Sequence, residues 1–199
     1  MTEINPDADW LKRAWIWSYK GQELSLLDYS VIDVDIEEIA HALAMTCRFG
    51  GHCKKFYSVA EHCVIVSEIM EERGNFSSAG LLGGLLHDAA EYILTDVPKP
   101  FKHLITDYKS YEDRIMNVIE EKYNINCNTP YIKMLDQDMV VSEAIALFKY
   151  LPEWIAEHPG SVIPDFESKY LACHDPEAAE FAFIERFREL TKPRVVHYD

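Results

Sequence analysis

The sequence predicts an all-α fold, a compact multi-helix bundle, on three observations. Apolar residues recur at the helical spacing of about 3.6 residues through most of the chain. Residues that favour helix starts, such as Thr129-Pro130 and Asp175-Pro176, stand directly before periodic segments. Strand signals are few, with 24–32 as the one short candidate. Because 48% of the 199 residues are apolar, the chain can bury a sizeable core, and we expect one domain over 1–199.

Six helices are expected, and several carry their own start signal. Ser58-Val59-Ala60-Glu61 is a capping box, in which the Ser58 hydroxyl accepts from the Glu61 N–H and the Glu61 carboxylate reaches back to the Ser58 N–H. The last helix is expected to point Phe181 into the core. The expected ranges are 34–46, 58–70, 78–94, 110–123, 129–151 and 176–190. Residues 152–164 hold three prolines and a glycine, which predicts a loop.

The helix expected over 78–94 is the most apolar of these, and only His87, Asp88 and Glu91 interrupt it. A helix that is apolar on all sides needs neighbours all round, so we expect it at the centre of the bundle. Its three glycines weaken a helix by about 1 kcal/mol each relative to alanine, and they indicate close approach of another helix.

Three ionisable side chains on such a helix indicate a functional site. A buried carboxylate such as Asp88 costs several kcal/mol unless it is paired or bound to metal. Glu91 lies four residues after His87 and three after Asp88, so the three side chains share one face of a helix. Imidazole with carboxylate is a ligand set that suits Mn, Co, Fe, Ni or Zn better than calcium.

Any further ligands must come from other helices. His62 lies one turn into the capped helix, among apolar residues, and Asp136 lies in the helix that opens at Thr129. Asp138 is a rival to Asp136, because both aspartates have apolar neighbours three and four residues away. An early histidine, an adjacent His-Asp pair and a distant aspartate are the signature of the HD phosphohydrolases.

The chain resembles this HD-domain superfamily, in the branch of the bacterial 5′-deoxynucleotidases and the phage deoxynucleoside triphosphohydrolases, including those that act on dATP. The matching stretches are Arg48-Phe49, Ser58–His62, Leu86–Glu91, Asp96–Lys102 and Lys133–Asp136. They occur in the family's order over about 40–150, whereas 152–199 carry no matching motif.

The resemblance implies the roles of the individual residues. The metal ligands would be His62, His87, Asp88 and Asp136, although Leu135 stands where the family prefers alanine before the last ligand. Glu91 would orient or deprotonate the attacking water, and Asp96 would assist near the leaving group. The residues implied to contact substrate are Arg48 and Phe49 at the phosphate, together with Asp88, Asp96, Val97, Pro98 and Lys99.

The expected activity is therefore metal-dependent removal of phosphate from a 2′-deoxynucleotide, to give the nucleoside. Hydrolysis of a deoxynucleoside triphosphate, for example dATP to deoxyadenosine and triphosphate, is the alternative, with Lys54, Lys55, Lys99 and Lys102 as candidate cations for the longer phosphate tail. A non-catalytic nucleotide-binding HD module is a more distant alternative. The expected cofactor is a divalent Co, Mn, Zn, Fe or Ni ion, with Mg²⁺ as a candidate second ion.

Charge and cysteine content limit the partners. With 19 basic and 34 acidic side chains the net charge is −15, which argues against nucleic-acid polymers as ligands and leaves a small deoxynucleotide as the expected partner. Five cysteines without a C-x-x-C pair, no signal pattern and no long apolar run predict a cytoplasmic protein that does not contact membranes, and we expect a homo-oligomer.

Two weaker patterns stay open. Cys47, His52, Cys53, His62 and Cys63 lie close in sequence, but their spacing fits no standard zinc pattern, so the cysteines are interpreted as packing residues. His52 follows closely after the Arg48-Phe49 pair, and either a role at the phosphate or a place in a loop or in the core is compatible with its position.

Overall fold

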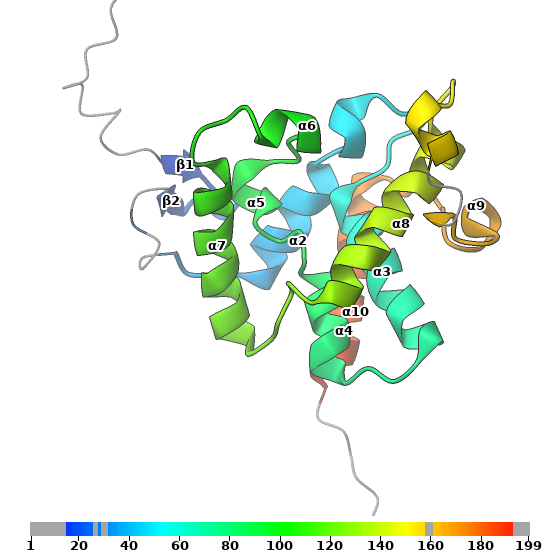
Figure 1. Cartoon of the computed structure of the whole chain (residues 1–199). Helices are drawn as coiled ribbons and strands as arrows, with labels where there is room; N and C mark the ends of the chain where they lie inside the picture. Colours follow the sequence, from blue (N-terminus) through cyan, green and yellow to red (C-terminus); the bar gives the residue numbers. More distant parts are fainter. Residues whose placement is uncertain (1–14, 26–27, 29–31, 158–160, 193–199) are drawn as a thin grey trace, which may run out of the picture.

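The computed structural model describes residues 15–25, 28, 32–157 and 161–192, and within them it confirms the all-α prediction (Figure 1). The elements in chain order are β1 (Trp15–Trp17), β2 (Glu23–Ser25), α2 (Ile36–Met45), η2 (Arg48–Gly51), α3 (Val59–Arg73), α4 (Ser78–Leu85), α5 (Glu91–Leu94), α6 (Lys99–Lys102), α7 (Tyr108–Tyr123), α8 (Pro130–Leu147), η3 (Glu153–Glu157), α9 (Phe166–Lys169) and α10 (Pro176–Thr191). None of these helices is long and apolar enough to cross a bilayer.

Side-chain caps fix where five of the described helices begin, whereas α7 has no side-chain hydrogen bond from its N-cap residue Asp107. In each of the five, a serine, threonine or aspartate oxygen accepts a hydrogen bond from an N–H of the first turn, which would otherwise have no partner. The capping residues are Asp35, Ser58, Ser77, Thr129 and Asp175. The starts predicted at Ser58, Thr129 and Asp175 are therefore confirmed.

Helix α3 lies in the middle of the bundle, where it packs against α2, α4, α8 and α10. Its residues from Val59 to Ser67 are all buried, so it has neighbours on every side. Close approach between α3 and α4 depends on glycine, because a Cβ at Gly84 would lie 2.5 Å from the Met70 sulfur. A Cβ at Gly83 would lie equally near the Asn126 carbonyl oxygen, at 2.5 Å. Gly84 thus serves the close helix approach that the sequence indicated, whereas Gly83 makes room for the loop between α7 and α8, and a Cβ at Gly80 would have no neighbour nearer than 3.6 Å.

The helix predicted over 78–94 is wrong in its second half. α4 ends at Leu85, residues 86–90 form turns, and α5 begins at Glu91. A continuing helix would bond the Asp88 N–H to the Gly84 carbonyl, but the His87 ring occupies that carbonyl at 2.8 Å. Backbone bonds then shift to i→i−3, as from the Glu91 N–H to the Asp88 carbonyl at 3.0 Å.

Four smaller expectations also differ from the structure. Helix α8 ends at Leu147 rather than near 151, and η3 occupies part of the predicted 152–164 loop, of which 158–160 lie outside the described residues. Phe181 is 65% exposed, while Phe183 is fully buried in its place. Of the candidate strand over 24–32, β2 covers Glu23–Ser25, residues 26–27 and 29–31 lie outside the described residues, and its antiparallel partner β1 was not foreseen.

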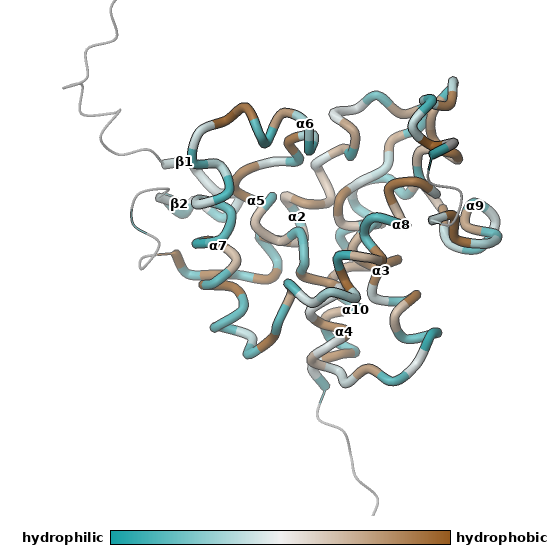
Figure 2. Tube along the Cα trace, viewed as in Figure 1, coloured by the Kyte–Doolittle hydropathy of each residue, from teal (hydrophilic) through white to brown (hydrophobic). Residues whose placement is uncertain are grey.

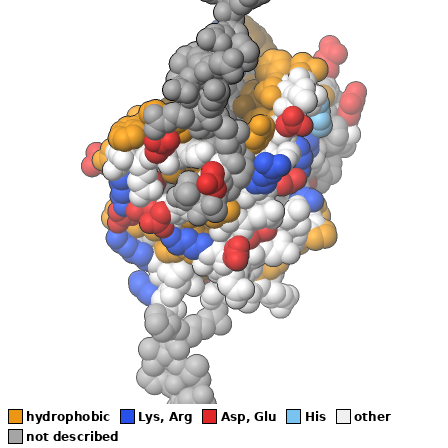
Figure 3. Space-filling view, turned by 90° about the vertical axis from the view of Figure 1, so that its left-hand side faces the viewer, with side chains coloured by type: hydrophobic (Ala, Val, Ile, Leu, Met, Phe, Trp, Pro, Cys, Tyr) orange, Lys and Arg blue, Asp and Glu red, His pale blue; other side chains and the backbone are white. Residues whose placement is uncertain are grey.

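The surface follows from the helix patterns. Hydropathy alternates along α7, as expected for a helix with one face on the core (Figure 2). On the face that carries the antiparallel pair β1 and β2, acidic and basic side chains are intermixed, and hydrophobic side chains gather at the upper edges (Figure 3). Elsewhere at single-residue level, exposed pairs such as Lys109–Asp113 at 2.6 Å bring opposite charges together on the surface.

Candidate metal centre

Four side chains from three separate segments converge on one point. His62 comes from α3, His87 and Asp88 from the turn between α4 and α5, and Asp136 from α8. One potential ligand atom from each lies within 4.8 Å of every other. Among the described residues this His–Asp cluster (His62, His87, Asp88 and Asp136) is the one group of this kind, and it comprises the four ligands that the sequence predicted.

The environment of His87 fixes the tautomer that a metal ligand needs. Its Nδ1 lies 2.8 Å from the carbonyl oxygen of Gly84. A carbonyl can only accept, so Nδ1 carries a proton, and Nε2 is the nitrogen that is left for a metal ion or a second proton. The same hydrogen bond that ends α4 therefore turns the free nitrogen of His87 toward the cluster.

His62 is oriented in the same sense by a carboxylate. Its Nδ1 lies 2.6 Å from Oε1 of the fully buried Glu143. Burial alone would raise the pKa of Glu143, but the charge of Arg48 and the contacts of His62 and Tyr57 lower that pKa to about 2, so the carboxylate is ionised and accepts. His62 thus also presents the lone pair of Nε2 to the cluster.

The two free nitrogens face each other at 3.2 Å, an arrangement that calls for a positive charge between them. Nε2 of His62 lies 3.3 Å from Asp136 Oδ1, and Nε2 of His87 lies 3.5 Å from Asp88 Oδ2. Atoms that bind one transition-metal ion at about 2.1 Å are about 3 to 3.5 Å apart. Two further pairs are longer, 3.7 Å from His62 Nε2 to Asp88 Oδ2 and 3.8 Å from His87 Nε2 to Asp136 Oδ1. The four side chains could therefore hold a metal ion through nitrogen and oxygen ligands.

The geometry also separates Asp136 from its rival. Burial would raise the pKa of Asp136, but hydrogen bonds and charges of His62 and His87 hold it well below the usual range. Asp138 is outside the His–Asp cluster, and its backbone carbonyl accepts from Ser142 at 2.9 Å. Of the two carboxylates that the sequence left open, Asp136 is the one that reaches the other three ligands.

Arg48 lies behind the cluster rather than at its mouth. Its guanidinium Nη2 is 3.1 Å from Glu143 Oε2, its Nη1 is 3.4 Å from Asp88 Oδ2, and the residue is 6% exposed. The charge of Arg48 balances the fully buried Glu143 and the partly exposed Asp88. Because Nη1 contacts a carboxylate of the cluster, Arg48 is still near any phosphate bound there.

Glu91 is buried beside the cluster, and only one of its two carboxylate oxygens has a hydrogen-bond partner. It is 5% exposed, Oε1 accepts from Lys102 Nζ at 3.3 Å, and Oε2 has no hydrogen-bond partner. Burial, followed by the charges of Asp88 and Asp96, raises the pKa of Glu91 well above its ordinary value. A buried oxygen of this kind costs about 1–3 kcal/mol. Among the described residues Glu38 also has such an oxygen, but only that of Glu91 lies beside the cluster, where it is free to hold a water or a ligand.

Asp96 holds the short loop that carries Phe49. Its Oδ2 accepts from the Phe49 N–H at 3.1 Å. Phe49 has φ +57°, a left-handed conformation that is strained for a bulky residue, and its ring packs edge-on against Phe148 at 4.9 Å. The structure therefore joins the Arg48-Phe49 stretch, expected at the phosphate, to Asp96, expected near the leaving group, although Phe49 and Asp96 are 47 residues apart.

The other predicted substrate residues lie around this loop with less contact. Val97 and Pro98 are partly buried before α6, while Lys99 is exposed and forms no ion pair with the described residues. The open candidates His52, Lys54 and Lys55 are exposed as well. Of the two lysines in the Asp96–Lys102 stretch, only Lys102 contacts a residue of the site, Glu91. Cys47 and Cys53 lie 3.7 Å apart between their sulfurs and outside the His–Asp cluster, as free thiols.

Glu143 and Tyr57 are the residues that sequence reasoning missed. Glu143 lies seven residues after Asp136, two helical turns on the same face, and this spacing within an apolar stretch could have found it. Tyr57 donates to Glu143 Oε1 at 2.8 Å, and nothing in the sequence distinguishes it from a core tyrosine.

The capping box at the start of α3 is only half confirmed. Ser58 accepts from the Glu61 N–H at 3.0 Å, as predicted. The Glu61 carboxylate, however, accepts from the N–H groups of three consecutive residues near the C-terminus, at 2.8 to 3.0 Å: Ala172, Cys173 and His174. This contact anchors part of the segment without motifs directly beside the ligand His62.

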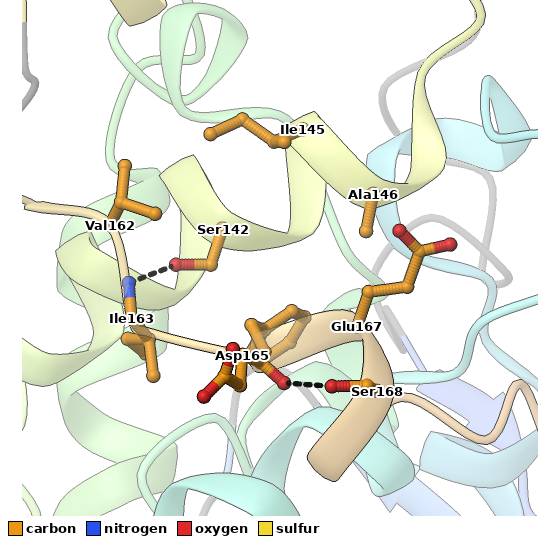
Figure 4. Close-up of a pocket in the computed structure, with 9 residues that line it drawn as sticks. Ser142, Ile145, Ala146, Val162, Ile163, Asp165, Glu167 and Ser168 are labelled. Carbon is orange, nitrogen blue, oxygen red and sulfur yellow. Dashed lines mark hydrogen bonds between the residues drawn. The ribbon is translucent and has the colours of Figure 1, made fainter.

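A cavity among the described residues is separate from the His–Asp cluster. It measures about 410 Å³ and lies between α8 and α9 (Figure 4). Ser142, Ile145 and Ala146 form its α8 wall, whereas Asp136 and Glu143 lie on a different face of the same helix. Ser142 stabilises the opposite wall by accepting from the Ile163 N–H at 2.9 Å.

Comparison with known proteins finds relatives of similar length. The chain is 36% identical over 183 residues to the uncharacterized protein YfdR of Escherichia coli K12, a match that covers 91% of this chain and 98% of YfdR. It is also 36% identical over 124 residues to an uncharacterized protein of Rhodobacter capsulatus, covering 60% of this chain and 63% of that protein. No family model matches the chain.

Proposed function

The chain belongs to the same family as YfdR of Escherichia coli, and we propose that it is a metal-dependent phosphohydrolase of the HD-domain type that acts on 2′-deoxynucleotides. The substrate part of this proposal comes from the order of the motifs between Arg48 and Asp136. The predicted homo-oligomer and cytoplasmic location stay predictions.

One observation carries the metal-dependent part of the proposal. The lone pairs of the His62 and His87 Nε2 atoms point at each other from 3.2 Å, because Glu143 and Gly84 each take the opposite ring N–H. Two such lone pairs repel unless a cation or a proton lies between them. The adjacent carboxylates of Asp88 and Asp136 supply negative charge for a divalent ion.

The remaining residues suit hydrolysis of a phosphate ester. A divalent ion bound by the four ligands would lower the pKa of water and offset charge on the phosphoryl oxygens. Glu91, through its free Oε2, can hold and deprotonate the attacking water. Arg48 can stabilise charge on the phosphate through Nη1, and Asp96 can protonate the leaving oxygen, since burial raises the pKa of Asp96.

Glu91 also favours an enzyme over a module that only binds nucleotides. Recognition of a nucleotide does not require a buried carboxylate with an unpartnered oxygen, and such a group lowers stability. A reaction that uses the oxygen to hold water gives a reason for this cost. Asp88 and Asp136 are partly exposed, at 22% and 38% of their side chains, so the site opens to solvent on their side.

The proposal is tested by a screen of ribo- and deoxynucleoside mono-, di- and triphosphates with Mn²⁺, Co²⁺, Zn²⁺, Ni²⁺ or Fe²⁺. We expect phosphate release from deoxynucleoside monophosphates with at least one transition metal. Release of intact triphosphate would instead identify a triphosphohydrolase. Metal-loaded protein that binds nucleotides but hydrolyses none of them during hours of incubation would contradict the proposed enzyme. It would identify the chain as a nucleotide-binding module without catalytic activity.

A further inference from the structure

Lys102 is the nearest cation on the outer side of Glu91, and it comes from a different helix. Its Nζ lies 3.3 Å from Glu91 Oε1 and 2.9 Å from Glu112 Oε1 of α7. It also lies 5.2 Å from the ring centre of Tyr108. The lysine side chain is 23% exposed, so these contacts are made where water screens them only in part.

These contacts attach α6 to the site. Lys99, Pro100 and Phe101 of this four-residue helix are all exposed, which leaves Lys102 as the α6 residue that turns inward. Helix α6 directly follows the 96–98 segment, which was expected to contact substrate. The pair Glu91–Lys102 therefore joins the proposed base to that segment.

The charges around Glu91 make this contact important for its orientation. Asp88 and Asp96 repel an ionised Glu91, and Arg48 is already held by Glu143. Lys102 is the cation among the described residues that contacts Glu91 directly. Because it binds Oε1, the other oxygen, Oε2, is left free for water.

We propose that Lys102 is a positioning residue, which holds Glu91 by its Oε1 so that Oε2 faces the attacking water, with Glu112 bracing the lysine. This inference rests on the proposed phosphohydrolase function. It assigns Lys102 no contact with the substrate phosphate.

The proposal is tested by a double-mutant cycle between the two residues. With the best substrate and metal from the screen, Lys102→Met should lower kcat roughly 10- to 100-fold, the scale for a misplaced catalytic group, while KM changes little. Lys102→Arg, which keeps the charge, should recover most of the rate. In a Glu91→Ala background, Lys102→Met should have no further effect, because its partner is already absent.

Lys109→Met is the matched control. Lys109 also pairs with Glu112, at 3.2 Å, but its side chain is 73% exposed and it does not contact Glu91. Its loss removes the same charge and should leave kcat unchanged. Bound metal and melting temperature, measured for every variant, show whether each protein is folded.

Three results would overturn the inference. Equal losses from Lys102→Met with and without Glu91 would indicate a structural role, and a raised KM with normal kcat would indicate substrate binding. A normal rate in Lys102→Met would show that Lys102 has no role in turnover, and it would leave the proposed phosphohydrolase function unaffected. Wild-type protein without turnover would overturn the proposed function and this inference together.

Discussion

Glu143 and His62 form the shortest contact around the His–Asp cluster, with Oε1 of the glutamate 2.6 Å from Nδ1 of the histidine. Both side chains are fully buried. The contact sets which nitrogen of His62 is free, and the other oxygen of Glu143 holds Arg48. One buried carboxylate therefore links His62, a predicted metal ligand, to the cation expected at the phosphate.

Glu143→Gln should weaken metal binding without removing a ligand. Loss of a carboxylate that orients a ligating histidine costs roughly 10- to 100-fold in metal affinity. Competition with a chelator of known affinity measures the change. Glu38→Gln is the control, since Glu38 is also a buried carboxylate, at 2% exposure, and lies outside the His–Asp cluster. Equal metal affinity in the Glu143 variant and the wild type would contradict the orienting role.

His87→Ala should abolish both bound metal and turnover. Its Nε2 is one of the four ligand atoms, and its Nδ1 contact with Gly84 also ends α4. Elemental analysis of the purified variant measures the metal, and phosphate release measures turnover. Full metal content in this variant would show that the ligand set is wrong.

How far the site could be predicted from the sequence depends on the range of the contacts. His87, Asp88 and Asp136 stand out locally, because ionisable residues interrupt apolar helical patterns there. The turn at 86–90 could not be predicted from periodicity, since it depends on the His87 ring taking a backbone carbonyl.

The pairing of Arg48 with Glu143 spans 95 residues, and no local pattern encodes it. For the fold, too, local features could be predicted from the sequence and features that depend on distant residues could not. Caps and apolar stripes predicted most helix starts, because both are local signals. The burial of Phe183 in place of Phe181 depends on which side of α10 meets α2, α3 and α4.

Glu91→Ala should separate chemistry from binding. Glu91 is outside the His–Asp cluster, so metal content and substrate affinity should stay near those of the wild type. The rate should fall on the order of 10²–10⁴, the usual scale for a positioned acid or base. Isothermal titration with a nucleotide and single-turnover kinetics measure the two quantities separately. A variant that lost its metal would place Glu91 among the ligands instead.

Phe49→Ala should change the ranking of substrates more than it changes metal content. Phe49 packs against Phe148 at the edge of the site and does not belong to the His–Asp cluster. Initial rates across the deoxynucleotide series measure the ranking, and Phe181→Ala, an exposed phenylalanine on α10, is the control. An unchanged ranking would remove the role assigned to Phe49.

DNA oligomers should not be substrates, because the net charge of −15 repels a polyanion. Rates on single-stranded or double-stranded oligomers, compared with mononucleotides at equal phosphate concentration, measure this preference. Comparable rates on the two would contradict the expected substrate class.

Metal affinity should rise with pH, because protons and the metal ion compete for the same two nitrogens. In the metal-free protein burial would lower the pKa of both His62 and His87. The charges of Glu143, Asp88 and Asp136 outweigh burial and raise both values, that of His87 strongly. The two imidazoles therefore stay protonated to higher pH than ordinary histidines do. Titration calorimetry in buffers of different ionisation enthalpy should detect proton release on metal binding.

The same shifts determine how stability depends on pH. Because the folded pKa values lie above the unfolded value of about 6.5, the protonated histidines stabilise the metal-free protein fully below that pH. This stabilisation is lost as pH rises through the folded pKa values, while a metal ion binds more tightly in the same range. The difference in melting temperature between metal-loaded and metal-stripped protein should therefore widen as pH rises from about 6 to 8. A difference that is constant or narrows would show that His62 and His87 do not exchange protons for metal.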